Sequence, residues 1–77
     1  MRDEFPMRII RLRRHRNMTV NQFAKYLGVG NKQVYTWEYG DSLPSFDMLY
    51  RIHTLTGVSL DWLVAGCGTM FPTVAHT

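Results

Sequence analysis

The spacing of apolar residues along the chain predicts five short helices and no strand. Apolar side chains recur three and four positions apart, which is the spacing that places them on one face of a helix. The connections between the expected helices are short, as they are in compact helical bundles. The expected helices span, in chain order, about Glu4 or Met7 to Arg16, 20–27, 31–39, 46–56 and 60–65.

The apolar positions mark an inner face on each expected helix. Trp62, in the last helix, is also expected in the core, because an aromatic residue at helical spacing more often packs inside than binds a ligand. In the first helix the outward row is expected to consist of Arg8, Arg11 and Arg14. The inward residues of the first four helices are expected to be Phe5, Ile9, Leu12, Phe23, Ala24, Leu27, Val34, Trp37, Met48, Leu49, Ile52 and Leu55.

Most of these helices carry end signals in the sequence. Thr19 and Gln22 form a T-x-x-Q capping box, in which each side chain accepts a hydrogen bond from the other residue's backbone N–H. Asp3, Ser45 and Ser59 are placed to cap the first, fourth and fifth helices. A glycine, which ends a helix without strain, follows each of the last four: Gly28, Gly40, Gly57 and Gly66.

The segment from Val20 to Gly40 has the pattern of two helices that meet at a tight corner. Ala24 lies where the helices cross and only a small side chain fits, and Gly28 lies where the chain needs a positive φ. Val34 and Trp37 turn one face of the second helix inward. Its outward positions hold Lys32, Tyr35, Thr36 and Tyr39. This is the pattern of a helix-turn-helix, and such polar groups on a rigid helix suit the major groove of DNA.

Basic and acidic residues are unevenly distributed along the chain. Seven basic residues and no acidic one lie between Met7 and Trp37, whereas four acids and a single arginine, Arg51, follow from Glu38 onward. The net charge of +3 therefore hides a cationic half, which indicates a polyanionic partner. A basic helix that is simply solvated is the alternative, but the neighbouring helix-turn-helix favours DNA.

Other classes of function find little support in the sequence. Cys67 is the single cysteine, so no intramolecular disulfide is possible, and no signal peptide or long apolar run indicates a membrane. The cytoplasm is the expected compartment. His15, His53 and His76 share no metal-ligand spacing with Cys67, and no Ser/His/Asp or Cys/His arrangement is visible. We therefore expect no enzyme, no metal, no cofactor and no small-molecule ligand.

Several short motifs occur in a particular order along the chain. They are L-R at 12–13, T-x-x-Q-F-A-x-x-L-G-V from 19, V-x-x-W-E-x-G from 34, a proline before a helix, and G-V-S-L-D-W-L-V-A-G from 57. In this order they resemble the lambda-repressor-like, Cro/Xre-type DNA-binding domains, particularly those of phage repressors. The resemblance implies an all-α, compact five-helix bundle containing a helix-turn-helix over residues 1–66. The tail at 67–77, apolar at Met70, Phe71 and Val74, is then a docked arm or a loose one.

The resemblance also implies roles for individual residues. Arg13 and Glu38 match a pair that commonly forms an ion pair between the first and third helices. The positions that match base-reading residues hold Asn31, Lys32, Gln33 and Thr36; Lys32 suits guanine, and the Thr36 methyl suits thymine. The residues expected to meet the DNA backbone are Thr19, Asn21, Tyr35, Tyr39, Arg11 and Arg14.

Two positions depart from the family pattern. Val20 stands where the family often has a glutamine that clamps a phosphate, and Gly30 stands where it often has a serine. We therefore expect a variant docking on DNA, in which the arginines of the first helix carry more of the phosphate binding.

The favoured hypothesis is a sequence-specific regulator of transcription. It would be a phage or bacterial repressor that binds double-stranded DNA as a homodimer on a palindromic operator. The alternative is a protein-binding adaptor on the same fold, such as an antitoxin, an antirepressor or an inhibitor of RNA polymerase. The chain could be a whole small protein or part of a longer repressor. The candidate dimer surface is Leu60, Val64, Met70 and Phe71, which could instead close the core of their own subunit.

Overall fold

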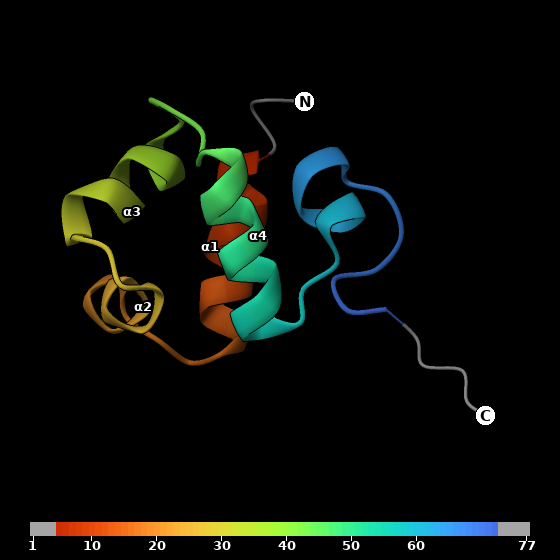
Figure 1. The fold of residues 1–77 in the computed structure, drawn as a ribbon, viewed down its shortest axis with the longest axis horizontal. Helices are drawn as coiled ribbons and strands as arrows, with labels where there is room; N and C mark the ends of the chain where they lie inside the picture. Colours follow the sequence, from red (N-terminus) through yellow and green to blue (C-terminus); the bar gives the residue numbers. More distant parts are fainter. Residues whose placement is uncertain (1–4, 73–77) are drawn as a thin grey trace.

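The computed structural model describes residues 5–72, and within that range the chain forms five helices and no strand (Figure 1). The prediction of an all-α fold is confirmed. Four of the helices are α-helical and the last is a π-helix. They are α1 (Phe5–His15), α2 (Val20–Leu27), α3 (Asn31–Tyr39), α4 (Phe46–Thr56) and η2 (Asp61–Ala65).

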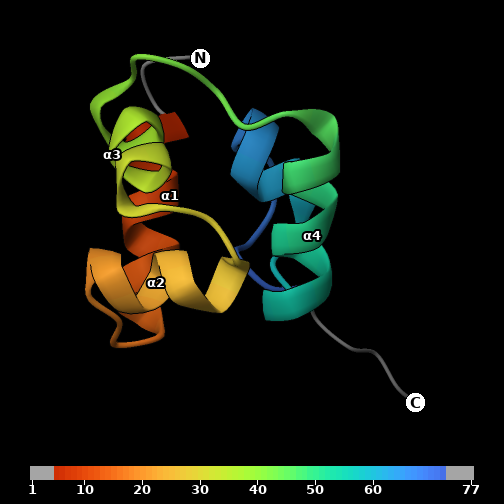
Figure 2. The same ribbon diagram turned by 60° about the vertical axis from the view of Figure 1, so that its left-hand side comes forward.

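The helices surround one apolar core. In Figure 1, α2 and α3 lie together at one end of the molecule and η2 lies at the other, with α1 and α4 between them. In Figure 2, α1 stands with α2 and α3, and α4 stands on the other side of the molecule, while η2 packs against α1. The buried apolar residues are Phe5, Ile9, Leu12, Phe23, Ala24, Leu27, Val34, Trp37, Ile52, Val58, Trp62 and Leu63.

The predicted caps form at three of the helix starts. The Gln22 N–H donates to the Thr19 hydroxyl at 3.1 Å, and the Thr19 N–H donates to the Gln22 side chain at 2.9 Å, so the capping box is complete. The Ser45 hydroxyl accepts from the Met48 N–H at 3.2 Å, and the Ser59 hydroxyl accepts from the Trp62 N–H at 3.3 Å. The cap predicted at Asp3 lies outside the described residues.

Arg8 does not belong to an outward row, so this prediction is wrong. Its side chain is buried, with 8% of the residue exposed. Its Nε donates to the Leu63 carbonyl at 2.8 Å and its Nη2 to the Val64 carbonyl at 3.1 Å. The last carbonyls of a helix lack partners within it, and η2 packs against this side of α1, so the guanidinium supplies donors to them. A Cβ at Gly66 would lie 3.0 Å from Arg8 Nη1, which leaves little room for a larger residue.

The inner face of α4 is also rotated from the prediction. Leu55, expected inside, is 40% exposed, whereas Thr56 is buried. The Thr56 hydroxyl donates to the Ile52 carbonyl at 2.7 Å and accepts from the Val58 N–H at 3.1 Å. These bonds hold the turn that brings Val58 into the core, and they draw Thr56 inward in place of Leu55. Met48 is half-buried against the core, and Leu49 lies beside it.

Residues 67–72 fold back onto the domain. The Ser59 N–H donates to the Met70 carbonyl at 2.8 Å, and the rings of His15 and Phe71 lie 4.9 Å apart. Met70 and Phe71 are half-buried and pack against the core. Over these residues the tail is therefore docked, whereas Val74 lies outside the described residues.

Candidate nucleic-acid interface

The corner between α2 and α3 has the geometry that the sequence predicted. Ala24 is 1% exposed, and its carbonyl accepts from the Val29 N–H at 2.9 Å. Gly28 ends α2 with φ at 79°, where a side chain would be strained. Val34 and Trp37 are fully buried, so the inner face of α3 is packed against the body of the domain.

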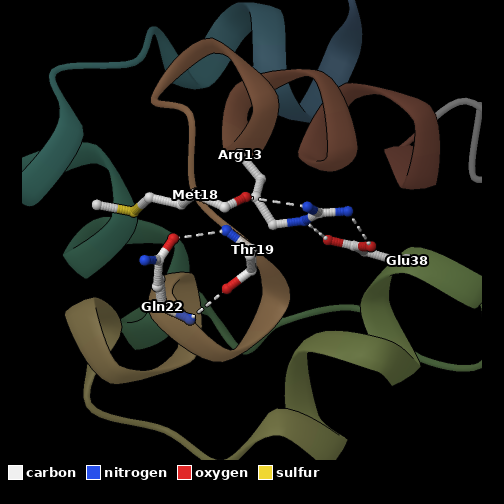
Figure 3. Close-up of polar contacts among 5 residues, drawn as sticks. All are labelled: Arg13, Met18, Thr19, Gln22 and Glu38. Atoms are coloured by element: carbon white, nitrogen blue, oxygen red, sulfur yellow. Dashed lines mark hydrogen bonds and ion pairs between the residues drawn. The ribbon is translucent and has the colours of Figure 1, made fainter.

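A bidentate ion pair links α3 to α1 (Figure 3). Arg13 Nε lies 2.7 Å from Glu38 Oε2, and Arg13 Nη2 lies 3.1 Å from Glu38 Oε1. The remaining nitrogen, Nη1, donates to the Met18 carbonyl at 3.0 Å, just before the first residue of the α2 cap. One guanidinium therefore joins α1, α3 and the start of α2, and so fixes the orientation of the helix-turn-helix.

The charge of Arg13 is secured by these contacts. Its hydrogen bond to Glu38 raises the pKa of Arg13, burial opposes the rise, and the charge of Glu38 adds to it. The side chains of Arg13 and Glu38 are 15% and 6% exposed. Because little water reaches the pair, its hydrogen bonds and the attraction between its charges both help to hold α3 in position.

The outward face of α3 is open to solvent. Asn31, Lys32 and Gln33 are exposed at its first turn, where Gly30 caps the helix without a side-chain hydrogen bond. Thr36 is half-buried, and its hydroxyl donates to the Gln33 carbonyl at 2.7 Å and accepts from Ser42 at 3.3 Å. The Thr36 hydroxyl is therefore engaged within the domain, and its methyl group is what remains for contact.

Two tyrosines complete this outward face. Tyr35 and Tyr39 are 41% and 73% exposed, and their rings stack with centroids 5.7 Å apart and an interplanar angle of 29°. Thr19 and Asn21 are exposed at the start of α2, which Arg13 holds close to α3. Val20 packs partly against the core, as an apolar residue at that position would.

The structure does not bring Arg11 together with α3. Arg11 is exposed beside a hollow whose other walls include Trp62 and Gly66, on the side of α1 that faces η2. The opposite side of α1, which carries Arg13, is the one that faces α3. Arg14 is exposed on the outer face of α1, next to Arg11.

Several other basic residues bind within the domain, which their sequence positions did not reveal. Arg51 donates to the Leu27 carbonyl at 3.1 Å and so closes the end of α2 next to the corner. Arg16 lies over the Tyr26 ring at 4.9 Å and donates to its hydroxyl at 3.3 Å. With Arg8 and Arg13 also engaged, much of the cationic half serves the fold. One feature of the sequence indicates that Arg8 is buried. Arg8 lies four positions before the inward residue Leu12, which places both on one helix face.

Residues 5–72 offer neither a metal cluster nor a membrane span. No three His, Cys, Asp or Glu side chains in that range are grouped so that they could hold a metal ion. None of the described helices is long and apolar enough to cross a bilayer.

The arrangement of α2 and α3 defines a helix-turn-helix domain, in which the second helix buries its apolar face and presents its polar one. The family model described as "Helix-turn-helix" matches residues 9–63. The chain therefore belongs to the Cro/C1-type helix-turn-helix family, whose members are DNA-binding regulators.

One curated relative extends this assignment. Over 64 residues the chain is 38% identical to a protein of Haemophilus influenzae that is named as an HTH-type transcriptional regulator. The match covers 83% of this chain and 26% of the relative, so the chain spans about a quarter of that protein's length. No solved structure matches the chain significantly.

Proposed function

We propose that this domain binds double-stranded DNA sequence-specifically, with the outward face of α3 in the major groove, and represses transcription as a phage or bacterial regulator does. The observation that carries the proposal is the rigidity of α3. Its inner face is fully buried at Val34 and Trp37, and the Arg13–Glu38 pair fixes it from the side. Its outward groups can therefore meet base edges without a large ordering cost. Such a regulator would act in the cytoplasm.

The first two turns of α3 would read bases. Asn31, Lys32 and Gln33 are exposed at the end of the helix that enters a groove in this class of motif. Lys32 would donate to guanine, an exposed amide of Asn31 or Gln33 would bracket adenine, and the Thr36 methyl would touch thymine. Thr19, Asn21 and Tyr39 would contact the backbone.

The arginines of α1 have a smaller part in this proposal than their number suggests. Arg8 and Arg13 are engaged inside the domain, and Arg11 lies on the η2 side of α1. Lys32 is an exposed cation on α3 itself, and Arg14, exposed on the outer face of α1, would contact the DNA backbone.

Binding to selected DNA tests the function. Duplexes enriched from a random pool should converge on one sequence, and the affinity for it should fall steeply as salt rises. Each phosphate that an exposed cation neutralises should contribute roughly −0.9 to the slope of a plot of log K against log salt. Fluorescence anisotropy measures this slope. A pool that never converges, with binding that salt does not affect, would favour the protein-binding adaptor.

We also propose that the regulator is a homodimer whose subunits meet across an apolar hollow between α4 and η2. Leu60 and Val64 line this hollow with Phe46 and Leu49, and Phe46 and Val64 are 77% and 49% exposed. Met70 and Phe71 pack within their own subunit instead. Because the hollow lies away from α3, a two-fold axis there would place the two α3 helices apart (Figure 2), as half-sites about 34 Å apart require.

A charge at Val64 tests this dimer. Val64→Asp should shift the protein from dimer to monomer in analytical ultracentrifugation, and should weaken binding to the palindrome more than about tenfold, because the aspartate would be buried unpaired. Leu55→Asp is the matched control, since Leu55 is exposed on α4 but does not line the hollow. Two results would contradict this dimer interface: a wild-type protein that stays monomeric and binds a single half-site, or a Val64→Asp protein that is still a dimer.

A further inference from the structure

Tyr35, which stacks on Tyr39 in α3, has chemistry that the base-reading proposal leaves unused. Lys32, Tyr35, Thr36 and Tyr39 follow each other at the spacing i, i+3, i+4 and i+7, so they share one face of the helix. Tyr35 lies on the second turn, between Lys32 and Tyr39. It therefore lies on the part of the helix that carries base-reading groups, whereas Tyr39 lies one turn further from the entering end.

The ring of Tyr35 is held in place by a neighbour on the same helix. It stacks on Tyr39, with centroids 5.7 Å apart. With 41% of the residue exposed, the ring offers a fixed apolar surface beside Lys32. A side chain that is already ordered loses less entropy on binding.

The available part of Thr36 matches this apolar surface. Because its hydroxyl is engaged with Gln33 and Ser42, Thr36 offers its methyl group. The middle of α3 therefore presents apolar groups next to the cation of Lys32. In the major groove the apolar group on a base edge is the 5-methyl of thymine.

We infer that Tyr35 is a specificity-determining residue whose ring covers a thymine 5-methyl group, with Tyr39 as the residue that positions the ring. This inference rests on the proposed function, replaces the backbone contact predicted for Tyr35 from the sequence, and adds the class of base that α3 selects. The operator should contain dT opposite the second turn of α3 in each half-site.

Replacing dT by dU tests the inference, since the two nucleotides differ by this methyl group. In the selected duplex, each dT is replaced in turn, and the affinity of the wild-type protein is measured. Besides the dT that the Thr36 methyl touches, one replacement in each half-site should weaken binding about fourfold, the equivalent of one buried methyl group. The Tyr35→Ala protein should bind with equal affinity to the duplex that has dT at that position and to the one that has dU there. The Tyr35→Phe protein should keep the full preference for dT.

Tyr50→Ala is the matched control, because Tyr50 is an exposed tyrosine on α4, away from α3. It should keep the preference for dT. If dU is tolerated at every position, or if Tyr35→Ala keeps the wild-type preference for dT at every position, the inference is overturned. A Tyr35→Phe protein that binds all duplexes more weakly while Tyr35→Ala keeps the preference for dT would mean that the hydroxyl meets the backbone, which also overturns it. These outcomes leave the proposed function standing, whereas a wild-type protein that prefers no duplex sequence would remove both.

Discussion

Glu38→Ala is expected to lower the free energy of unfolding by about 3 kcal/mol, because it leaves the guanidinium of Arg13 with an unpaired charge in a site that water barely reaches. The pair is bidentate and the Glu38 side chain is only 6% exposed, so screening by solvent reduces this loss of stability little. A domain of this size has a total stability of roughly 4–12 kcal/mol. The variant should therefore lose between about a quarter and three quarters of the domain's stability.

Urea denaturation followed by circular dichroism measures this loss. Asp41→Ala is the matched control, because it removes an exposed carboxylate from the loop after α3 and should change stability by less than about 0.5 kcal/mol. Arg13→Met combined with Glu38→Leu should recover part of the loss, since neither charge then remains buried. The recovery is partial because the Met18 carbonyl loses its donor. A Glu38→Ala protein as stable as Asp41→Ala would show that the pair does not fasten α3.

Arg8→Met is expected to lower the free energy of unfolding by about 2–3 kcal/mol. Methionine keeps most of the apolar stem but removes the donors that bind the carbonyls of Leu63 and Val64. A buried acceptor left without a donor costs about 1–3 kcal/mol, and the Val64 carbonyl is only partly buried. Because these bonds tie η2 to α1, amide exchange at Leu63 should also become faster.

Arg11→Met is the control for this prediction. Arg11 lies one turn after Arg8 on α1 but is exposed, so its replacement should change stability by less than about 0.5 kcal/mol. Equal stability of the two variants, with unchanged exchange at η2, would contradict the anchoring role of Arg8.

The parts of the fold that follow from local chemistry could be predicted from the sequence. The capping box of Thr19 and Gln22 and the corner at Gly28 depend on residues a few positions apart, so their signals are complete within a short segment. The Arg13–Glu38 pair joins distant residues, and family resemblance together with helix geometry was enough to predict it.

The errors lie where a distant segment decides the environment of a residue. Arg8 is inward because the carbonyl end of η2, more than fifty residues later, packs beside it. Leu55 turns outward because the turn after α4 draws Thr56 inward. The count of basic residues in a half of the chain could not show which of them serve the fold, as Arg8 and Arg16 do. The π-helical form of η2 also had no local signal.

The roles of the exposed residues of α3 remain predictions. Their exposure and their shared face agree with base reading, and the stacking of Tyr35 on Tyr39 came only from the structure. The aromatic residues at i and i+4 gave a hint of that contact, since such pairs are neighbours on a helix.

The central claim is that the outward face of α3 lies in the major groove, and Lys32 tests it most directly. Bound duplexes are selected from a random pool with the wild-type protein, with Lys32→Ala and with Lys25→Ala, which removes an exposed lysine from α2. The account predicts that Lys32→Ala alone loses the preference for guanine at one position of each half-site, with an affinity loss of about 1–3 kcal/mol on the wild-type operator. The same preferred sequence for all three proteins, with equal affinities, would contradict it.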